Sequence, residues 1–210
     1  MFDMIVKGGP VMYPIILCSI IALAIVIERV FQLYHARIDT RKFMDEIANV
    51  LRRNKIMEAI ETCDNTPGPI AHILKAGILK HDRARAEIKE AIEEAGMYEV
   101  PRLEKNLTAL ATIAHISPLL GLLGTVVGMV GCFQVIQEKS TSLNPVSPGD
   151  LAGGIWGALI TTVAGLIVAI PTYVAYNYLV SRVNNFVLDM ERSATDLINI
   201  LTQRGTEYEV

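Results

Sequence analysis

The sequence predicts an all-α membrane protein with three transmembrane helices, the second and third of which extend into a cytoplasmic helical bundle. Two observations carry this prediction. The 210-residue chain is 51% hydrophobic with a mean hydropathy of +0.38, which is too apolar for an ordinary soluble domain. Its apolar residues are also gathered into three long runs without Asp, Glu, Lys or Arg, each long enough for the roughly 20 residues that cross a bilayer core.

The uncharged runs cover residues 8–27, 106–137 and 151–181. From them we expect transmembrane helices over residues 11–33, 106–138 and 151–181. The last two runs would each extend roughly 46–48 Å as helices, so they must tilt or project beyond the bilayer. Charges follow the first run and no small-residue cleavage site is visible, so we expect a retained span and not a signal peptide.

Basic residues predict the orientation. Residues 28–105 contain 14 Lys or Arg and residues 182–210 contain three, whereas the first ten residues contain only Lys7 and residues 138–150 only Lys139. Because basic residues concentrate on the cytoplasmic side, we expect cytoplasmic helices over residues 34–105 and a cytoplasmic helical tail over residues 182–210. The N-terminal residues 1–10 and a loop over residues 139–150 then lie outside, and spans two and three form an antiparallel hairpin.

The segments between the spans also have a helical pattern. Phe43, Ile47 and Leu51 recur among charges at the period of a helix, and the tail continues span three with apolar residues at near-heptad spacing. A further helical segment precedes span two. We expect it to run on into that span with a bend at Pro101.

Composition and motifs argue against several functional classes. A net charge of −3 leaves no electrostatic footprint for nucleic acid. The three cysteines and four histidines show neither a disulfide framework nor metal-ligand spacing. No nucleophile–base pair, HExxH motif or glycine-rich phosphate loop is present. We therefore expect no enzyme activity, no metal and no bound cofactor.

Small residues form stripes on spans two and three. The stretch LLGLLGTVVGMVG at residues 119–131 places four glycines in a helix interior, where each costs roughly 1 kcal/mol relative to alanine. Such stripes allow close helix packing in lipid, either between helices of one chain or between copies, and we favour self-assembly. The stripes are Gly121, Gly124, Gly128 and Gly131 on span two, and Gly153, Gly157, Thr161, Gly165 and Ala169 on span three.

Two threonines are expected at matching depth. Thr125 lies 13 residues before Glu138, and Thr162 lies 12 residues after Asp150, so both sit roughly 18–20 Å below the outer helix ends. They would either line a polar path or bond their own helix backbone, and spacing alone favours the backbone bond. Helix kinks are expected near the inner edge, at Pro118 and Pro171.

Spans two and three lack the groups that usually carry protons through a membrane. No carboxylate lies between Pro118 and Gln137 or between Leu151 and Ser181. His115 is expected at the cytoplasmic interface in an ordinary hydrogen-bonding role. Because intramembrane ionisable groups mark ion pathways, an ion path through this chain would need its titrating group from another polypeptide.

The residues LLGLLGTVVGM, followed by a short loop and GALITTVAGLIVAIPTYVAYN, resemble the paired signature of the MotA/TolQ/ExbB proton-channel family. The Ile27-Glu28-Arg29 sequence that ends span one is also similar to the family's first helix. The resemblance covers all three spans in order. Three spans without a fourth are typical of the ExbB/TolQ branch.

The resemblance implies a homopentamer in the bacterial inner membrane, with its outer side in the periplasm. Spans two and three of each copy would line a central pore, packed through Gly121, Gly124, Gly128, Gly157 and Gly165. Two copies of a single-span ExbD- or TolR-like partner would enter the pore and carry the ion on a membrane aspartate. Thr125 and Thr162 fall on the family's pore-facing positions. We place the adjacent Thr161 on the ion path with them.

One position departs from the family pattern. ExbB and TolQ chains carry a glutamate five residues before the span-three threonine, and Gly157 occupies that place here. The resemblance implies H⁺ as the transported ion, and the missing glutamate leaves Na⁺ as the alternative, because a site lined by hydroxyl groups without a second carboxylate could serve either ion. The implied function is a ring subunit that energises TonB-type uptake through a TonB-like protein. The alternatives are a Tol-type or gliding-type motor of the same family and a non-conducting oligomeric scaffold.

Overall fold

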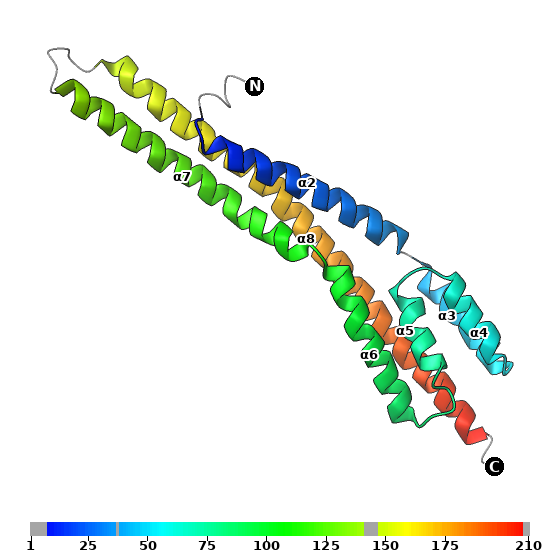
Figure 1. Ribbon diagram of the computed structural model, residues 1–210. Helices are drawn as coiled ribbons and strands as arrows, with labels where there is room; N and C mark the ends of the chain where they lie inside the picture. Colours follow the sequence, from blue (N-terminus) through cyan, green and yellow to red (C-terminus); the bar gives the residue numbers. More distant parts are fainter. Residues whose placement is uncertain (1–7, 37, 141–146, 208–210) are drawn as a thin grey trace. The chain divides into compact units, whose positions relative to one another are not determined.

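The computed structural model describes residues 8–36, 38–140 and 147–207, and helices joined by short turns make up these residues. None of these residues lies in a strand, so the all-α prediction is confirmed. In chain order the helices are α2 (Met12–His35), α3 (Thr40–Arg52), α4 (Ile56–Asn65), α5 (Pro69–Ile78), α6 (Arg85–Glu104), α7 (Leu107–Ser140) and α8 (Pro148–Glu207), as Figure 1 shows.

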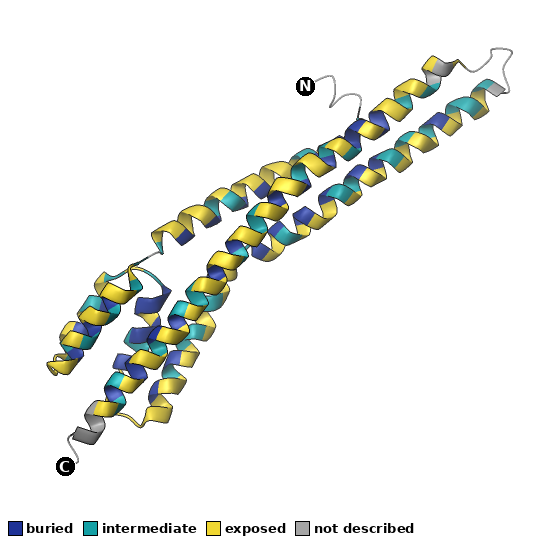
Figure 2. Cartoon of the chain, turned by 180° about the vertical axis from the view of Figure 1, so that it is seen from behind, coloured by how far each residue is buried: buried dark blue, intermediate teal, exposed yellow. Residues whose placement is uncertain are grey.

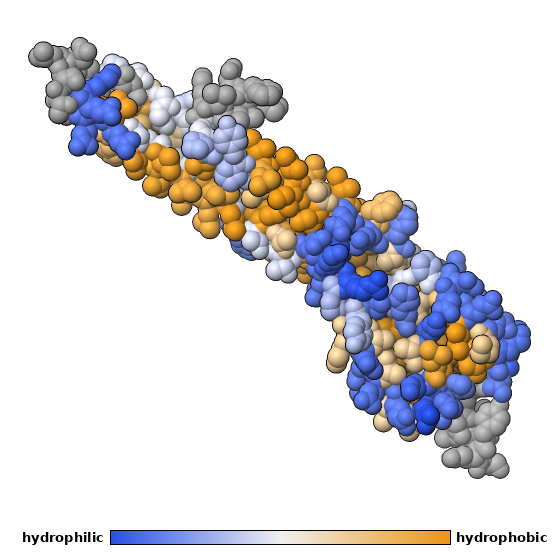
Figure 3. All heavy atoms as spheres, in the orientation of Figure 1, coloured by the Kyte–Doolittle hydropathy of each residue, from blue (hydrophilic) through white to orange (hydrophobic). Residues whose placement is uncertain are grey.

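The chain divides into two compact units. The first, which we call the membrane unit, comprises the described residues up to Ile27 together with residues 106–178. The second, the polar unit, comprises residues 28–105 and the described residues from Leu179 onward. Helices α2 and α8 each contribute residues to both units. Space-filling Figure 3 shows apolar residues gathered over the membrane unit and hydrophilic residues over much of the polar unit.

Helices α2, α7 and α8 are each long and apolar enough to cross a membrane, as the sequence predicts. At most 33% of the most apolar stretch of each helix is buried within the chain. Narrow buried stripes run along these helices while their other faces stay exposed (Figure 2). On α2 the buried stripe is Met12, Ile15, Ala22 and Ile25. Contiguous apolar faces of this extent are not stable in water, and they suit a lipid surface or contact with other chains.

Span two does not continue from the preceding helix, so that prediction was wrong. Helix α6 passes through Pro101 and ends at Glu104, and α7 begins at Leu107. Between them Asn106 has a φ of 62°, a left-handed conformation that asparagine tolerates better than most other residues. The chain therefore breaks at a left-handed residue and not at the proline. Span three does continue as predicted, because α8 is one helix of 60 residues.

The polar unit has its own apolar core. Helix α5 packs against α4 and α6, and nearly all of its apolar side chains are buried. The predicted face of α3 is buried too, and the Asp39 side chain accepts a hydrogen bond from the Lys42 backbone N–H at 3.3 Å to cap that helix. This bond lowers the pKa of Asp39. The core residues include Phe43, Ile47, Leu51, Ile70, Ile73, Leu74, Ile78, Ile92, Val183, Met190, Leu197 and Leu201.

Cys63 behaves as a small apolar residue of this core. It is 1% exposed, and burial, helped by the neighbouring Asp64 carboxylate, raises the pKa of its thiol to about 12. A thiol with that pKa is not a nucleophile at physiological pH. Cys132, in the membrane unit, is buried as well. Both cysteines fit the packing role expected from the sequence.

Candidate pore-lining site

Helices α7 and α8 form the antiparallel hairpin that the sequence predicts, and they lie side by side in Figures 1 and 2. Contacts in the N-terminal half of α7 join Ser117 to Gly165, and contacts nearer its C-terminus join Gly128 to Gly154. Partner numbers on α8 therefore fall as numbers on α7 rise. This register fixes the level at which each threonine lies along the hairpin.

Glycines allow the two backbones to touch in the middle of the hairpin. A Cβ atom on Gly121 would lie 3.0 Å from both the Thr161 carbonyl oxygen and the Thr162 Cα. On the opposite helix, a Cβ on Gly165 would lie 2.5 Å from the Ser117 carbonyl oxygen and 3.1 Å from the Gly121 Cα. Because the nearest atoms are mostly backbone, no side-chain rotation could make room for a methyl group at these two positions.

The glycine stripe of α7 is thus used mainly within one chain. Gly121, Gly124 and Gly128 all face α8, which corresponds to the intramolecular alternative left open by the sequence. Gly131 and Gly153 have no heavy atom within 4 Å of an added Cβ. These two stripe glycines leave open space beside them in the single chain.

Thr161 lies inside this contact. It is 1% exposed, and its side chain would collide with any Cβ placed on Gly124. Its hydroxyl donates to the Ala158 carbonyl oxygen at 2.6 Å, with the Gly121 carbonyl at 3.4 Å. Within a single chain, Thr161 is therefore a packing residue between α7 and α8, and it is less accessible than Thr125 or Thr162.

Thr162 and Thr125 are half-buried, and their hydroxyl groups bond differently. The Thr162 hydroxyl donates across the hairpin to the Gly121 carbonyl oxygen at 3.1 Å. The Thr125 hydroxyl donates within its own helix to the Leu122 carbonyl oxygen at 2.6 Å. The prediction that each threonine bonds the backbone of its own helix is therefore confirmed for Thr125 and is wrong for Thr162. Since Gly121 precedes Thr125 by one helical turn, the two threonines lie within about 6 Å of a common level.

The remaining residues singled out in the sequence lie elsewhere along α7 and α8. Pro118 and Pro171 lie inside helices that continue through them, and the kinks expected there stay a prediction. Gly157 is buried. His115 is exposed. Its Nδ1–H donates to the Ala111 carbonyl oxygen at 2.8 Å, and its ring packs edge-on against the Tyr173 ring at a centroid distance of 6.1 Å.

Sequence reasoning missed part of the hairpin contact. Gly154, and not the neighbouring Gly153 of the four-residue stripe, packs against the Cys132 sulfur. The Cys132 thiol in turn lies 3.6 Å from the Leu151 carbonyl oxygen. Ser117 is completely buried and donates to the Ile113 carbonyl oxygen at 2.7 Å. A stripe that starts at Gly154 and continues three residues later at Gly157 would have indicated the face of α8 that contacts α7. Because Gly153 and Gly154 are adjacent, the sequence allows a stripe that starts at either residue.

The site is polar without being ionisable. Its polar atoms are hydroxyl and carbonyl oxygens, and the sequence places no carboxylate between Leu151 and Ser181. Across the described ranges, no cluster of three or more His, Cys, Asp or Glu could hold a metal ion. Such an arrangement can solvate an ion or a carboxyl group that enters from outside, but it offers no group of its own to take up a proton.

Comparisons with known proteins identify relatives of this chain. The chain is 32% identical over 170 residues to an ExbB-like biopolymer transport protein of Synechocystis, an alignment that covers 81% of this chain and 80% of the relative. It is 32% identical over 199 residues to the Tol-Pal system protein TolQ of Haemophilus influenzae, covering 89% and 85%. An ExbB homolog of Methanothermobacter thermautotrophicus is 28% identical over 204 residues, covering 97% and 69%.

A family model also matches the part of the chain that contains the site. The match extends over residues 65–192 and so includes all of α7, α8 as far as residue 192, and all three threonines. Together with the relatives, it shows that the chain belongs to the MotA/TolQ/ExbB proton channel family.

Proposed function

We propose that this protein is the ring subunit of an ion-driven motor in the bacterial inner membrane. The observation that carries the proposal is a pair of threonine hydroxyls, on Thr125 and Thr162, within about one helical turn of a common level in a membrane hairpin of a proton channel family. The hairpin itself has no titratable group at that level. Intramembrane ionisable groups mark ion pathways, and these hydroxyls offer polar contacts to such a group when another chain supplies it.

The motor requires a partner and several copies of this chain. Five copies would surround a pore lined by α7 and α8, with the N-terminus in the periplasm and the polar unit in the cytoplasm. Two copies of an ExbD- or TolR-like protein would place a single helix each in the pore and supply the titrating aspartate. The low burial of α2, α7 and α8 supports such an assembly, because one chain leaves most of each apolar helix uncovered.

The hydrogen bonds suggest which state of the partner's carboxyl group the site favours. The hydroxyl hydrogens of Thr125 and Thr162 are already donated to the Leu122 and Gly121 carbonyl oxygens. Each hydroxyl oxygen therefore presents lone pairs. Lone pairs accept a bond from a protonated carboxylic acid or coordinate a cation, whereas a carboxylate needs donors. The ring would then stabilise the protonated partner, and release of the proton would break these contacts and permit movement.

The transported ion and the process that the motor drives are proposed from the oxygen atoms of the site and from the relatives. We propose H⁺ as the transported ion, with Na⁺ as the alternative that hydroxyl and carbonyl oxygens would also coordinate. Each monovalent ion supplies about 2.3 kcal/mol per 100 mV of membrane potential. We propose that the motor passes this energy through its partner to a TonB-like protein. The similarity to TolQ of Haemophilus influenzae keeps a Tol-type task as the second candidate, and the protein acts in neither case as an enzyme.

Ion entry into liposomes tests this function against a non-conducting scaffold. The chain, co-expressed with its neighbouring reading frames and purified as a complex, is reconstituted with a pH-sensitive dye inside the vesicles. A potassium gradient with valinomycin sets a potential of about 100 mV, negative inside. We expect acidification with the complex and none with this chain alone. A complex that contains the single-span partner but admits neither H⁺ nor Na⁺ would establish the scaffold instead.

A further inference from the structure

Helix α2 begins beside the middle of the α7–α8 hairpin. A Cβ on Gly8 would lie 3.3 Å from the Thr161 Cγ2 atom, and the Thr161 side chain also faces Gly124 of α7. These residues all belong to the membrane unit. In Figures 1 and 2 the ends of α7 and α8 that join each other extend past the first turn of α2. Gly8 therefore marks, at the start of the first span, the level at which the candidate pore-lining threonines lie.

The backbone that leads into α2 limits how deeply this level can lie in lipid. Residues 8–11 form turns, with Gly9 at a φ of 67° and Pro10 exposed, and the helix begins at Met12. Irregular backbone that faces lipid does not occur inside the hydrocarbon core, because its polar groups would have no water to bond. The outer boundary of the hydrocarbon core therefore lies no further out than these turns.

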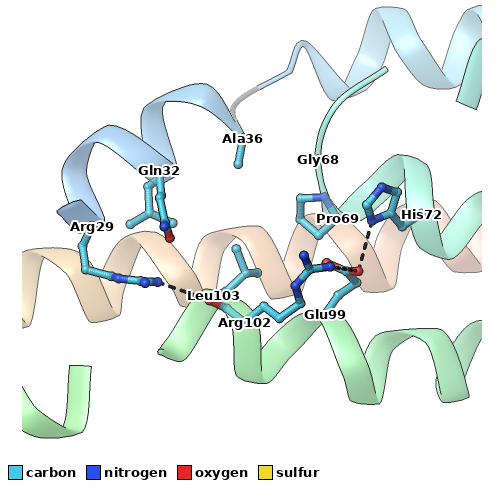
Figure 4. A pocket seen from close by; sticks show the side chains of 10 residues that line it. Arg29, Gln32, Ala36, Gly68, Pro69, His72, Glu99, Arg102 and Leu103 are labelled. Atoms are coloured by element: carbon cyan, nitrogen blue, oxygen red, sulfur yellow. Dashed lines mark hydrogen bonds and ion pairs between the residues drawn. The ribbon is translucent and has the colours of Figure 1, made fainter. Parts of the chain in front are cut away.

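A polar pocket limits the core at the other end of α2. Figure 4 shows this pocket of about 210 Å³, with Arg29 and Gln32 of α2 and with Glu99 and Arg102 of α6 among its lining residues. Arg29 is 1% exposed, and its Nη1 donates to the Arg102 carbonyl oxygen at 3.2 Å. Glu99 Oε1 lies 3.0 Å from both Arg102 Nη1 and His72 Nδ1. Ionisable groups are costly inside hydrocarbon, so the core ends before Arg29 on α2.

The positions of charged residues in the three spans lead to the same outer boundary. A hydrocarbon core of about 30 Å takes about 20 helical residues. Counted outward from the first charged residue at the inner end of each span, the core ends at Gly8, Thr125 and Thr162. The charged residues from which these counts start are Glu28, Lys105 and Arg182, respectively. All three counts therefore end close to the level that the contact between Gly8 and Thr161 marks in the structure.

Both helices of the hairpin continue far beyond this boundary. Thr125 lies 13 residues before Glu138 and Thr162 lies 12 residues after Asp150, so this outer hairpin is roughly 18–20 Å long. The headgroup layer on one side of a bilayer is only about 5–8 Å thick. Trp156, which is 56% exposed, lies roughly 9 Å outward of Thr162. Because tryptophan is typical of the membrane–water interface, its position agrees with a boundary near the threonines.

A bilayer centred on the hairpin would fit α2 poorly. The uncharged runs 106–137 and 151–181 have their midpoints further out, so the core would shift outward by roughly 8–9 Å. The turns before α2 would then enter hydrocarbon, and the exposed Leu23 and Ile27 near the other end of the run would leave it. In the outer hairpin, by contrast, neighbouring copies in the proposed ring can cover exposed apolar residues such as Val127 and Phe133.

We propose that the outer boundary of the hydrocarbon core lies at the level of Thr125 and Thr162. The core then includes residues 8–27, 106–125 and 162–181, and the outer hairpin, residues 126–138 and 148–160, stands outside it. This inference deepens the proposed function and rests on it for the orientation of the chain and for the ring that covers the outer hairpin. An ion would reach the threonines without crossing hydrocarbon, and most of the membrane potential would act between the threonines and the inner side.

Tryptophan fluorescence of the full chain in liposomes tests where the core lies on α2. The chain contains one tryptophan, Trp156, so Leu17→Trp or Tyr13→Trp is introduced together with Trp156→Phe. Both positions are exposed and lie one turn apart on the same face of α2. The quenchers are phosphatidylcholines brominated either near the ends of the acyl chains or near the headgroup. Because position 17 lies at the middle of residues 8–27, we expect a higher ratio of deep to shallow quenching for Leu17→Trp than for Tyr13→Trp.

The native Trp156 gives a second readout, on the hairpin itself and in the unmodified chain. We expect both brominated lipids to quench Trp156 less than they quench the tryptophan of Leu17→Trp. A ratio for Tyr13→Trp equal to or above that for Leu17→Trp would overturn the proposal, because it would move the centre of the core toward the threonines. Quenching of Trp156 as strong as that in Leu17→Trp would overturn it as well. Neither readout involves ion flow, so this failure is distinguishable from failure of the acidification test.

Discussion

Replacing Thr162 by valine is expected to slow ion-driven transport strongly while the ring still assembles. Valine has nearly the same shape but lacks the hydroxyl that donates to the Gly121 carbonyl oxygen. Loss of one such bond between membrane helices costs only about 0.6 kcal/mol and at most about 2 kcal/mol. An ion or carboxyl group in the pore, however, would lose a polar contact where no water replaces it. We expect the initial rate of vesicle acidification to fall by roughly tenfold to a hundredfold.

The matched control for this experiment lies on the same helix. Thr172 is also largely buried in α8, and its hydroxyl donates to the Val168 carbonyl oxygen of its own helix at 2.6 Å. Thr172 lies ten residues after Thr162, roughly 15 Å further along α8 and away from the level of the two threonines, so Thr172→Val should retain transport. Thr125→Val should behave like Thr162→Val. If both Thr162→Val and Thr125→Val transport ions at the wild-type rate, the two hydroxyls do not line the ion path.

Replacing Gly121 by alanine is expected to destabilise the hairpin, against the usual preference of helices. In an open helix this substitution stabilises by roughly 1 kcal/mol. Here the new Cβ would lie 3.0 Å from backbone atoms of Thr161 and Thr162, so α8 must move away. Overpacking of this kind costs about 1–3 kcal/mol. For a chain of this size the melting temperature should fall by about 2–10 °C.

Gly131→Ala provides the comparison on the same helix. Nothing lies within 4 Å of a Cβ at Gly131, so its substitution should leave the melting temperature of the detergent-solubilised chain unchanged or higher. The measurement is circular dichroism at increasing temperature for both variants. Equal melting temperatures for Gly121→Ala and Gly131→Ala would mean that the close contact between α7 and α8 does not exist.

Much of the fold follows from the sequence because lipid imposes simple rules. Long uncharged runs become helices, since every backbone polar group must bond within its own segment in hydrocarbon. The break between α6 and α7 was harder to locate. Pro101 is a strong signal, but α6 continues through it to Glu104, and the helical run stops where Lys105 takes an extended and Asn106 a left-handed conformation. A single asparagine carries too little local preference to predict that break.

The candidate site shows what pattern alone leaves undecided. A stripe of small residues predicts close packing but does not identify the surface that it contacts. Gly121 and Gly165 contact the opposite helix of the hairpin, whereas Gly131 and Gly153 have open space beside them. For Thr125 and Thr162, the spacing in the sequence predicts their position along the hairpin. The direction in which each hydroxyl donates depends on which carbonyl oxygen lies nearest. Only the register of the hairpin determines that.

Native mass spectrometry of the complex purified in detergent tests the central claim most directly. The claim is that this chain forms a ring around a partner that supplies the titrating group, and the sample is the chain co-expressed with its neighbouring reading frames. The account predicts five copies of the 23.1 kDa chain holding two copies of a small single-span protein. A monomer or dimer of this chain that holds no such protein would contradict it.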